Sequence, residues 1–381
     1  MADAEDSTIV LTYKFRLLPN RRQHWTLEEI IESQRVLYNA ALMERIDCYR
    51  KTGRTPNKNE QFKELTELRK FECFAGIPLN LQRWTLKQLD DSYQAFFRRV
   101  KNRGGKAGHP RFRGKGRWQS FGFSEFSGIT LREGRIRFKG LPGSLRIHLH
   151  RPLPKGKPLS CTFTRGHKGW YVCLQYRVPV QPLPATGQQV GIDVGLTTLA
   201  TLSTGEAIAN PRHTKRAEKE LRRRQRALSR CKKGSNRRKK VKASVTWLHA
   251  KIANSRKTHL HQTSAKLVRE NDLIAVEKLN VKGLSSGMLA KGVNDAGWSI
   301  LKNYLAYKAA WAGRELVEVK AAGTSQTCPN CGAVAKKTLS ERTHRCDCGC
   351  VIDRDHAAAR IILARAVVSP VASQREALAC A

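Results

Sequence analysis

The segment spanning residues 190–202 constrains this chain most, because it places a carboxylate inside an apolar strand. Its aliphatic and β-branched residues predict two short buried strands joined by a tight turn. Asp193 lies in the first strand, between Ile192 and Val194. An acid in such surroundings is costly unless it is paired or binds a cation. Two interpretations follow: an exposed acid at the end of a strand, or a ligand for a hard metal ion held on a rigid sheet.

Two later acids stand in matching settings. Residues 273–279 predict a second apolar strand, and Glu277 lies near its end. Asp355 stands at the start of an Ala-rich helix whose Ala358 and Ile362 can pack on a sheet. An acid at that place could cap the helix, or it could complete a metal site with Asp193 and Glu277.

The charge of the chain points to a polyanionic partner. The 381 residues carry 71 Lys and Arg against 31 Asp and Glu, a formal net charge of +40. With 40% hydrophobic residues, the chain can still form two or three globular domains. No long apolar run or signal peptide is present, so we expect nucleic acid and not a membrane as the partner.

Two basic segments are candidates for the contact with nucleic acid. Residues 104–118 combine glycines, cations and aromatics, including Arg111 and Arg113, which suits phosphates and stacked bases; a flexible basic linker is the alternative. Residues 211–242 predict two antiparallel helices with a thin apolar seam and basic outer faces, which solvent or a nucleic acid could cover. We expect a nucleic acid to cover these faces, and the candidate contact residues are Arg222, Arg223, Arg224 and Arg226.

Cysteines gather near the C-terminus in a pattern typical of a zinc site. Cys328 and Cys331 form a Cys-x-x-Cys pair, followed by Cys346 and Cys348. Cys350 offers another choice of ligand, because the second pair is tighter than usual. Four thiolates leave no open position on the metal, so a zinc held here is structural and not catalytic.

The remaining pattern predicts the order of the elements. Residues 9–17 alternate as a strand, residues 21–101 are helical, and residues 121–180 form short strands that suggest a small barrel joined by the first strand. Residues 283–295 are rich in Gly and Ser and predict a mobile loop, before a helix over 298–312 and a strand over 316–320.

Taken together, these motifs resemble the TnpB family of transposon-encoded RNA-guided nucleases, which are related to compact type V CRISPR effectors. The resemblance covers nearly the whole chain, and its C-terminal motifs are the specific ones. It is carried by the acid in the 190–202 hairpin, the acid-ending strand, the cysteine motif 328–332, the motif 342–349, residues 353–359, and residues 108–112. The family usually has Asn where this chain has Ala357.

The resemblance implies a multidomain α/β and β fold. An N-terminal small β-barrel with an inserted helical bundle precedes a RuvC-like, RNase H-like α/β nuclease domain with an inserted zinc knuckle. The implied boundaries are the first barrel strand at 1–18, helical insertion at 19–103, rest of the barrel at 104–180, linker at 181–186, nuclease part at 187–327, zinc element at 328–350, and second nuclease part with tail at 351–381.

The resemblance also implies roles and partners. Asp193, Glu277 and Asp355 become the catalytic carboxylates that hold Mg²⁺ or Mn²⁺, with Asp353 as an alternative third ligand. One structural Zn²⁺ falls on Cys328, Cys331, Cys346 and Cys348. The implied partners are a guide RNA and double-stranded target DNA read beside a short adjacent motif. We expect a monomer in the RNA complex, acting in transposition in the prokaryotic cytoplasm at the nucleoid.

Two other functions stay open at this point. One is an RNA-guided DNA-binding repressor that does not cleave, which the three intact acids argue against. The other is a basic zinc-containing RNA-binding protein with no enzymatic role, for which the three acids would lie scattered in the fold.

Overall fold

The computed structural model describes residues 7–71, 76–102, 107–335, 338 and 341–368. The chain divides into two compact units, one over Val10–Val178 and one that runs from Pro179 and includes the start of the first strand. Several predicted features lie outside the described residues: most of the N-terminal tail, the start of the basic segment at 104–106, and the tail from residue 369.

The unit Val10–Val178 is built on a seven-stranded sheet with the order β2-β6-β7-β1-β5-β4-β3. The first strand is therefore an inner strand of this sheet, as predicted, and its Phe15 and Leu17 are buried. Closure into a barrel stays a prediction. The strands are β1 (Thr8–Leu18), β2 (Ser120–Phe123), β3 (Ile129–Arg132), β4 (Arg135–Phe138), β5 (Leu145–His148), β6 (Ser160–Gly166) and β7 (Gly169–Pro179).

Helices follow β1 and precede β2, in the part of the chain where the sequence spacing predicted them. They are α1 (Arg21–Thr52), α2 (Lys58–Leu68) and α4 (Leu79–Lys101), and α4 packs against both of the others. Asn20 begins α1 with a capping box, in which its side chain and that of Gln23 each accept the other's backbone N–H. Trp84 of α4 lies so close to β2 that a Cβ on Gly122 would stand 2.8 Å from its ring nitrogen.

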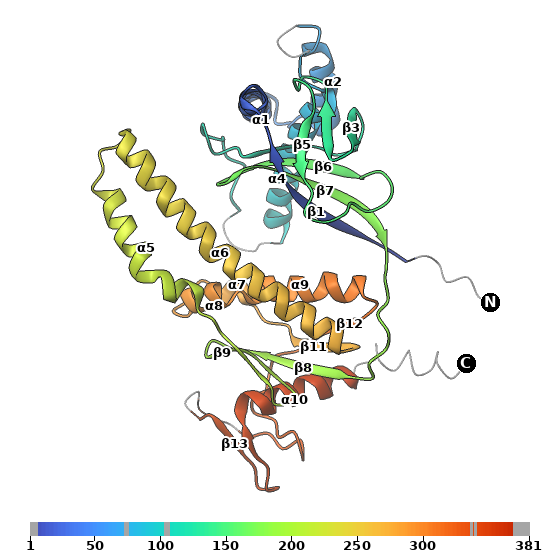
Figure 1. The fold of residues 1–381 in the computed structure, drawn as a ribbon, viewed down its shortest axis with the longest axis vertical. Coiled ribbons are helices and arrows are strands. Elements are labelled where there is room, and N and C mark those ends of the chain that lie inside the picture. Colours follow the sequence, from blue (N-terminus) through green and yellow to red (C-terminus); the bar gives the residue numbers. More distant parts are fainter. Residues whose placement is uncertain (1–6, 72–75, 103–106, 336–337, 339–340, 369–381) are drawn as a thin grey trace, which may run out of the picture. The chain divides into compact units, whose positions relative to one another are not determined.

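The second unit contains a five-stranded sheet with the order β10-β9-β8-β11-β12 (Figure 1). Its strands are β8 (Gln189–Val194), β9 (Thr198–Leu202), β10 (Ala207–Ala209), β11 (Leu273–Glu277) and β12 (Glu315–Val319). The first three are antiparallel neighbours, whereas β8, β11 and β12 run parallel. The two strands predicted around Asp193 and the strand predicted to end at Glu277 are thus confirmed.

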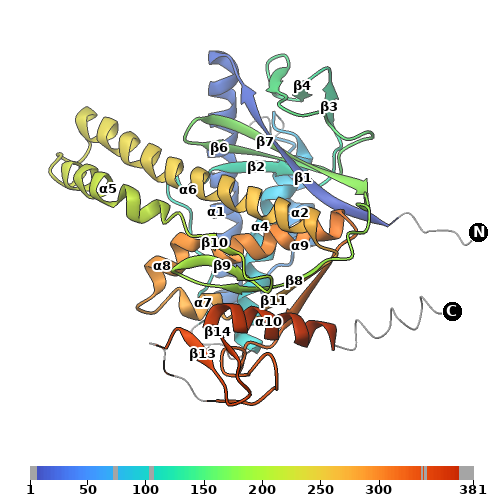
Figure 2. The ribbon, with the colours of Figure 1, turned by 60° about the horizontal axis from the view of Figure 1, so that its bottom comes forward.

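Helices cover both faces of this sheet (Figures 1 and 2). On one face, Val190, Ile192, Ile274 and Val276 form a core with residues of α6 (Asn236–Glu270) and α9 (Trp298–Trp311). On the other face, Leu273, Ala275 and Val319 pack against Ile362 and Ala366 of α10 (Arg354–Val367). Alternate residues of each strand therefore face opposite helices, as the period of a strand requires.

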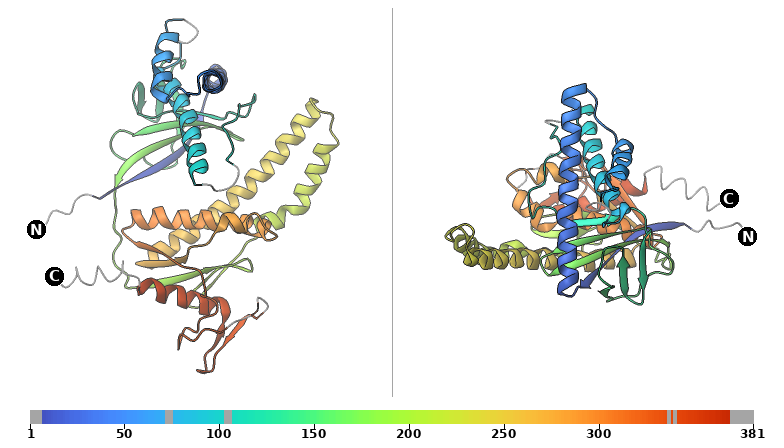
Figure 3. Two further views of the ribbon diagram at one scale, coloured as in Figure 1. Left: turned by 180° about the vertical axis from the view of Figure 1, so that it is seen from behind. Right: turned by 90° about the horizontal axis from the view of Figure 1, so that it is seen from above.

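The predicted basic helices form an antiparallel hairpin that extends beyond the sheet of this unit (Figure 3). It consists of α5 (His213–Ser229) and the long helix α6, which pack along each other. Gly234 turns the chain with φ 85°, and Ser235 caps α6 through a hydrogen bond from the Arg238 N–H. The seam is thin as expected: Val245 and Leu248 of α6 are buried, and no residue of α5 is.

The prediction of a mobile loop at 283–295 was wrong. This stretch contains the end of α7 (Val281–Leu284) and most of α8 (Ala290–Ala296), and Val293 and Asp295 are buried. A partly buried ion pair between Asp295 and Arg256, 2.9 Å apart, ties α8 to α6. Glycine and serine content alone gave no sign of this partner, which lies 39 residues earlier in the sequence.

The segment that contains the clustered cysteines adds a two-stranded sheet of β13 (Thr343–Arg345) and β14 (Val351–Asp353). Strand β14 leads directly into α10. Among the helices of the described residues, none combines the length and apolar character needed to cross a bilayer.

Candidate functional site

Asp193 and Glu277 lie level with each other on neighbouring strands. The parallel register pairs Ile192 with Val276, so the next residue of each strand is one of the two acids. Since Ile192 and Val276 belong to the core under α6 and α9, strand alternation turns both acids to the face that α10 covers. The carboxyl ends of parallel strands are where open α/β sheets place their functional groups.

Helix α10 crosses β8 at very close range, which brings its first turn to this end of the sheet. A Cβ on Gly191 would stand 2.1 Å from the backbone oxygen of Ala359, so only glycine permits the contact. Asp355 lies in the first turn of α10, one turn before Ala359. Ala357, two residues further along the helix than Asp355, is fully buried.

The capping role that the sequence allowed for Asp355 belongs to Asp353. The Asp353 carboxylate accepts the backbone N–H groups of Asp355 and His356, at 2.9 and 3.1 Å. Spacing could not decide between two acids that flank a helix start. Asp355 contacts Arg354 at 3.4 Å instead, and its side chain is partly exposed.

The electrostatics of the site reflect a concentration of negative charge. Burial raises the pKa of Asp193 to about 8, and the charges of Glu277 and Asp355 act in the same direction. Burial also raises the pKa of Glu277, against a hydrogen bond from Thr324 and the charge of Arg365. Such carboxyls ionise readily only when a cation is near, so the donor set suits a hard divalent metal.

A loop after β12 supports Glu277, and sequence reasoning did not find it. Thr324 is buried and donates its hydroxyl to Glu277 Oε1. Arg365 of α10 holds the same loop by donating to the backbone oxygens of Lys320 and Ala322, at 2.9 and 2.8 Å. A threonine and an arginine are too common to signal such a role without the fold.

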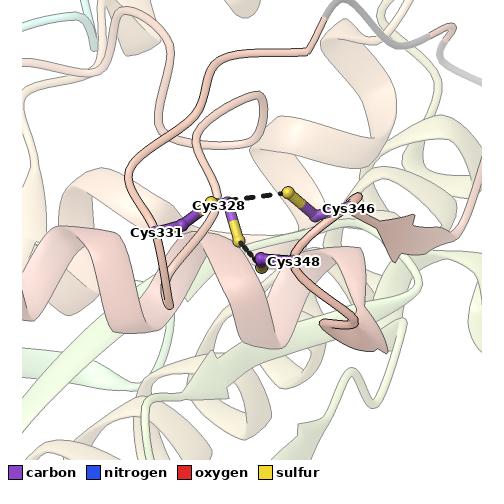
Figure 4. Close-up of side chains that lie close together, drawn as sticks. All are labelled: Cys328, Cys331, Cys346 and Cys348. Carbon is purple, nitrogen blue, oxygen red and sulfur yellow. Dashed lines mark hydrogen bonds between the residues drawn. The ribbon is translucent and has the colours of Figure 1, made fainter.

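The four cysteines predicted as zinc ligands lie together (Figure 4). Cys328 and Cys348 have their sulfurs 3.6 Å apart, and those of Cys331 and Cys346 are 3.5 Å apart. Sulfurs at about 2.3 Å from a tetrahedral zinc stand about 3.8 Å from each other, so the spacing fits such an ion. Backbone N–H groups of Cys331 and Asn330 lower the pKa of the Cys328 thiol to about 6, which favours the thiolate.

A second group of potential ligands shares Cys328. It joins Cys328 to His344 and Cys350, both buried, with ligand atoms that lie within 4.8 Å of one another. The alternative ligand that the sequence raised, Cys350, is therefore close to the cluster but on its buried side.

The predicted nucleic-acid residues of α5 fall into two kinds. Arg222, Arg223 and Arg226 are exposed, and the first two pair with Glu218 and Glu220 on the same helix. Arg224 is only 24% exposed and donates to the backbone oxygen and the hydroxyl of Ser244, at 3.0 and 2.7 Å. Its guanidinium therefore ties α5 to α6, a role that the charge pattern could not indicate.

Arg111 and Arg113 lie in the other unit, beside a cavity of about 460 Å³ that they line with Arg99 and His109. The Asn39 side chain holds the backbone of Arg113 by a pair of hydrogen bonds, at 2.8 and 3.0 Å. The Arg113 guanidinium lies 5.5 Å from the centre of the Tyr38 ring. The segment is thus anchored on α1 and contributes cations to one cavity.

Family comparisons match three parts of the chain. Residues 9–54 match a helix-turn-helix domain of OrfB proteins, residues 171–287 match OrfB_IS605, described as a probable transposase, and residues 298–362 match the Cas12f1-like TNB domain. A solved complex of Cas12f1 with guide RNA and target DNA has a similar fold, with TM-score 0.59 at 14% identity over 91% of this chain and 83% of that one.

Whole-length relatives decide the family. A protein of Streptomyces pristinaespiralis, named "Putative RNA-guided DNA endonuclease", is 38% identical over 92% of this chain and 88% of its own length. InsQ of Escherichia coli carries the same designation and is 29% identical over 88% of this chain and 86% of its own. The TnpB-like protein L79 of Acanthamoeba polyphaga mimivirus is 31% identical over 34% of this chain and 26% of its own length. On this evidence, the chain is a member of the TnpB family.

Proposed function

We propose that this protein is an RNA-guided DNA endonuclease of a transposable element, which hydrolyses phosphodiesters at Asp193, Glu277 and Asp355. The observation that carries the proposal is the register of β8 and β11, which sets the first two acids level on one face of the sheet, while the close contact at Gly191 brings the first turn of α10 to that face. The strand order supports an RNase H-like nuclease domain, since three antiparallel strands are followed by two parallel ones.

The three acids are suited to hold two divalent cations. Cations held by these carboxylates would supply activation of a water molecule and compensation of charge at the phosphodiester. Asp193 and Glu277 offer ligands from rigid strands, and Thr324 fixes the orientation of Glu277. Asp355 offers a third carboxylate from α10, because Asp353 has taken the capping role. Intact acids in this arrangement do not favour a repressor that binds without cutting.

We assign the structural zinc to Cys328, Cys331, Cys346 and Cys348, on the sulfur spacing given above. The exposed arginines of α5 and the anchored segment with Arg111 and Arg113 would contact guide RNA and target DNA through their phosphates. Base pairing between guide and target then supplies the sequence specificity, so the protein needs no base-reading helix. We assign the predicted barrel and helices to the binding of the guide RNA and the adjacent-motif duplex.

The test begins with the RNA that co-purifies with the protein. Sequencing it identifies the guide segment, and a plasmid with the matching target beside randomised bases serves as substrate. We expect the wild-type complex to cut this plasmid with Mg²⁺ or Mn²⁺. Asp193→Ala, Glu277→Gln and Asp355→Asn should each lower the cleavage rate by at least about a thousandfold while leaving target binding nearly intact.

Asp353→Asn is the matched control, since asparagine caps a helix as well as aspartate does. It should cut at the wild-type rate. Loss of cleavage in Asp353→Asn together with activity in Asp355→Asn would move the third ligand by two residues. Cleavage that survives all three site substitutions would rule out this nuclease site.

A further inference from the structure

A cavity of about 320 Å³ lies beside the turn that follows Asp193. Three segments of the second unit form its wall: the β8–β9 turn, the start of α5, and α8. Since α7 and α8 follow β11 in the chain, the strands that carry Asp193 and Glu277 both lead into this wall. The residues that matter here are Leu196, Thr197, Arg212, Lys215, Lys291 and Gly292.

Cations dominate the lining. Arg212, Lys215 and Lys291 are all exposed to solvent at the cavity. One carboxylate, that of Glu218, opposes them, and it is already shared between Lys291 at 2.6 Å and Arg222 at 3.0 Å. The cavity therefore keeps an excess of positive charge.

The second acid in the wall, Asp295, is fully engaged and adds no free negative charge. It is 9% exposed and accepts the backbone N–H and the hydroxyl of Thr214, at 2.9 and 2.6 Å, besides its pair with Arg256. Although burial disfavours the ionised form, the Thr214 hydrogen bonds and Arg256 lower the pKa of this carboxyl. The cavity is consequently unsuited to a metal cation and suited to an anion.

The backbone at Arg212, which lines the cavity beside the β8–β9 turn, is held in an unusual conformation. Its φ of 49° and ψ of 50° lie in the left-handed region, which side chains other than glycine rarely adopt. The Asn210 side chain fixes it, accepting the Arg212 N–H at 3.1 Å and donating to the Leu196 oxygen at 2.9 Å. Strained residues persist where the surroundings over-determine them, often at ligand sites.

The remaining lining limits the kind of anion. Among the described residues that line the cavity there is no aromatic ring on which a base could stack. Leu196, Thr197 and Gly292 leave a small, partly apolar wall that suits a sugar next to a phosphate. Thr197 follows Asp193 by four residues, so at most about 14 Å of extended chain separates this part of the wall from that acid.

We infer that this cavity binds one phosphodiester of the DNA strand that is presented to Asp193 and Glu277, and so sets where that strand lies in the site. The inference rests on the proposed nuclease function and deepens it. Lys291 and Arg212 would contact the non-bridging oxygens, and the Leu196–Gly292 wall would border the sugar. Lysine and arginine contacts of this kind position a strand without reading its sequence.

Single-phosphate replacement tests the inference on the full chain bound to its co-purified RNA. The Glu277→Gln background prevents cutting, and the probe is a single-stranded oligothymidylate carrying one neutral methylphosphonate, moved along the strand. We expect one position to weaken binding by at least about tenfold. The same scan should be flat in Lys291→Ala. It should also be flat in Gly292→Leu, which fills the cavity against Leu196 without changing charge.

Lys219→Ala is the charge control, because Lys219 is an exposed lysine of α5, whose start forms part of the cavity wall, and does not itself line the cavity. Its scan should keep the position effect. Two results would overturn the inference. One is a binding affinity that does not depend on the methylphosphonate position in the protein that carries only Glu277→Gln. The other is a position effect that persists in both Lys291→Ala and Gly292→Leu.

A second arm separates DNA from RNA as the source of the phosphate. The RNA-free protein is titrated with its own RNA, and Lys291→Ala should bind it as Lys219→Ala does. A selective loss of RNA affinity in Lys291→Ala would overturn the assignment to DNA. The scan does not need cleavage, so a position effect in a complex that never cuts supports the cavity and contradicts only the proposed nuclease function.

Discussion

Asp193 is held in the folded protein at an energetic cost, and that cost can be measured. Its pKa is raised from 3.8 to about 8, so between these values the folded state keeps a proton that the unfolded state releases. The stability of the metal-free protein should therefore fall as pH rises from about 4 to about 8. Asp193→Asn removes this effect and should stabilise the metal-free protein at neutral pH, by on the order of 4 kcal/mol.

Thermal unfolding without added Mg²⁺ measures this difference across the pH range. The melting temperature of Asp193→Asn should exceed that of the wild type at pH 7 and match it near pH 4. Added Mg²⁺ should raise the wild-type melting temperature and leave that of the variant unchanged, because a ligand stabilises only the state that binds it. Asp353→Asn, which removes an exposed carboxylate, should differ little from wild type. An equal gain in both variants would point to general charge relief instead.

Single residues were predictable from sequence where the local pattern alone decides. Asp193 and Glu277 were found because each interrupts an apolar run, and burial in a sheet is what such runs specify. The division of roles between Asp353 and Asp355 was not predictable, since it depends on which carboxylate meets the free N–H groups of α10. The internal role of Arg224 depends likewise on Ser244, which lies on the neighbouring helix.

At the scale of elements, the cysteine-rich hairpin should depend on Cys328, Cys331, Cys346 and Cys348 and not on Cys350. Thiolate-bound zinc contributes folding energy, of the order of 10–16 kcal/mol in small zinc peptides. Cys348→Ser should therefore lose the zinc and loosen residues 324–353, whereas Cys350→Ser should retain one zinc per chain. Elemental analysis of the purified variants gives the metal content, and hydrogen exchange reports the loosening. Zinc retained in Cys348→Ser but lost in Cys350→Ser would assign the site to the buried group with His344.

Elements were predictable in proportion to how local their signals are. The two larger sheets contain the strands that alternation or apolar runs indicated, and α1 and α6 begin at the capping residues Asn20 and Ser235. The segment 283–295 was misjudged because its stability comes from the distant pair of Arg256 and Asp295. The sequence did not predict the cavity either, since Arg212 and Lys291 are brought together only by tertiary packing.

At the scale of the whole molecule, the formal net charge of +40 should make nucleic-acid binding strongly dependent on salt. Each phosphate contact adds about 0.7–0.9 to the slope of log affinity against log salt concentration. Replacing the exposed Arg222, Arg223 and Arg226 together by glutamine should reduce that slope by about two to three. Their pairs with Glu218 and Glu220 do not protect them, because exposed ion pairs are worth no more than about 1 kcal/mol.

Arg224→Gln separates charge from structure within the same helix. This variant also removes one positive charge, but the Arg224 guanidinium already contacts Ser244 and lies 5.5 Å from the centre of the Trp247 ring. Its loss should therefore lower the melting temperature of the hairpin and barely change the salt slope. Titrations of the co-purified RNA at several salt concentrations measure the slope for each variant. A triple variant with an unchanged slope would mean that this face of α5 meets solvent in the complex. The counterions would then be released by other basic surfaces, with the segment of Arg111 and Arg113 the next to test.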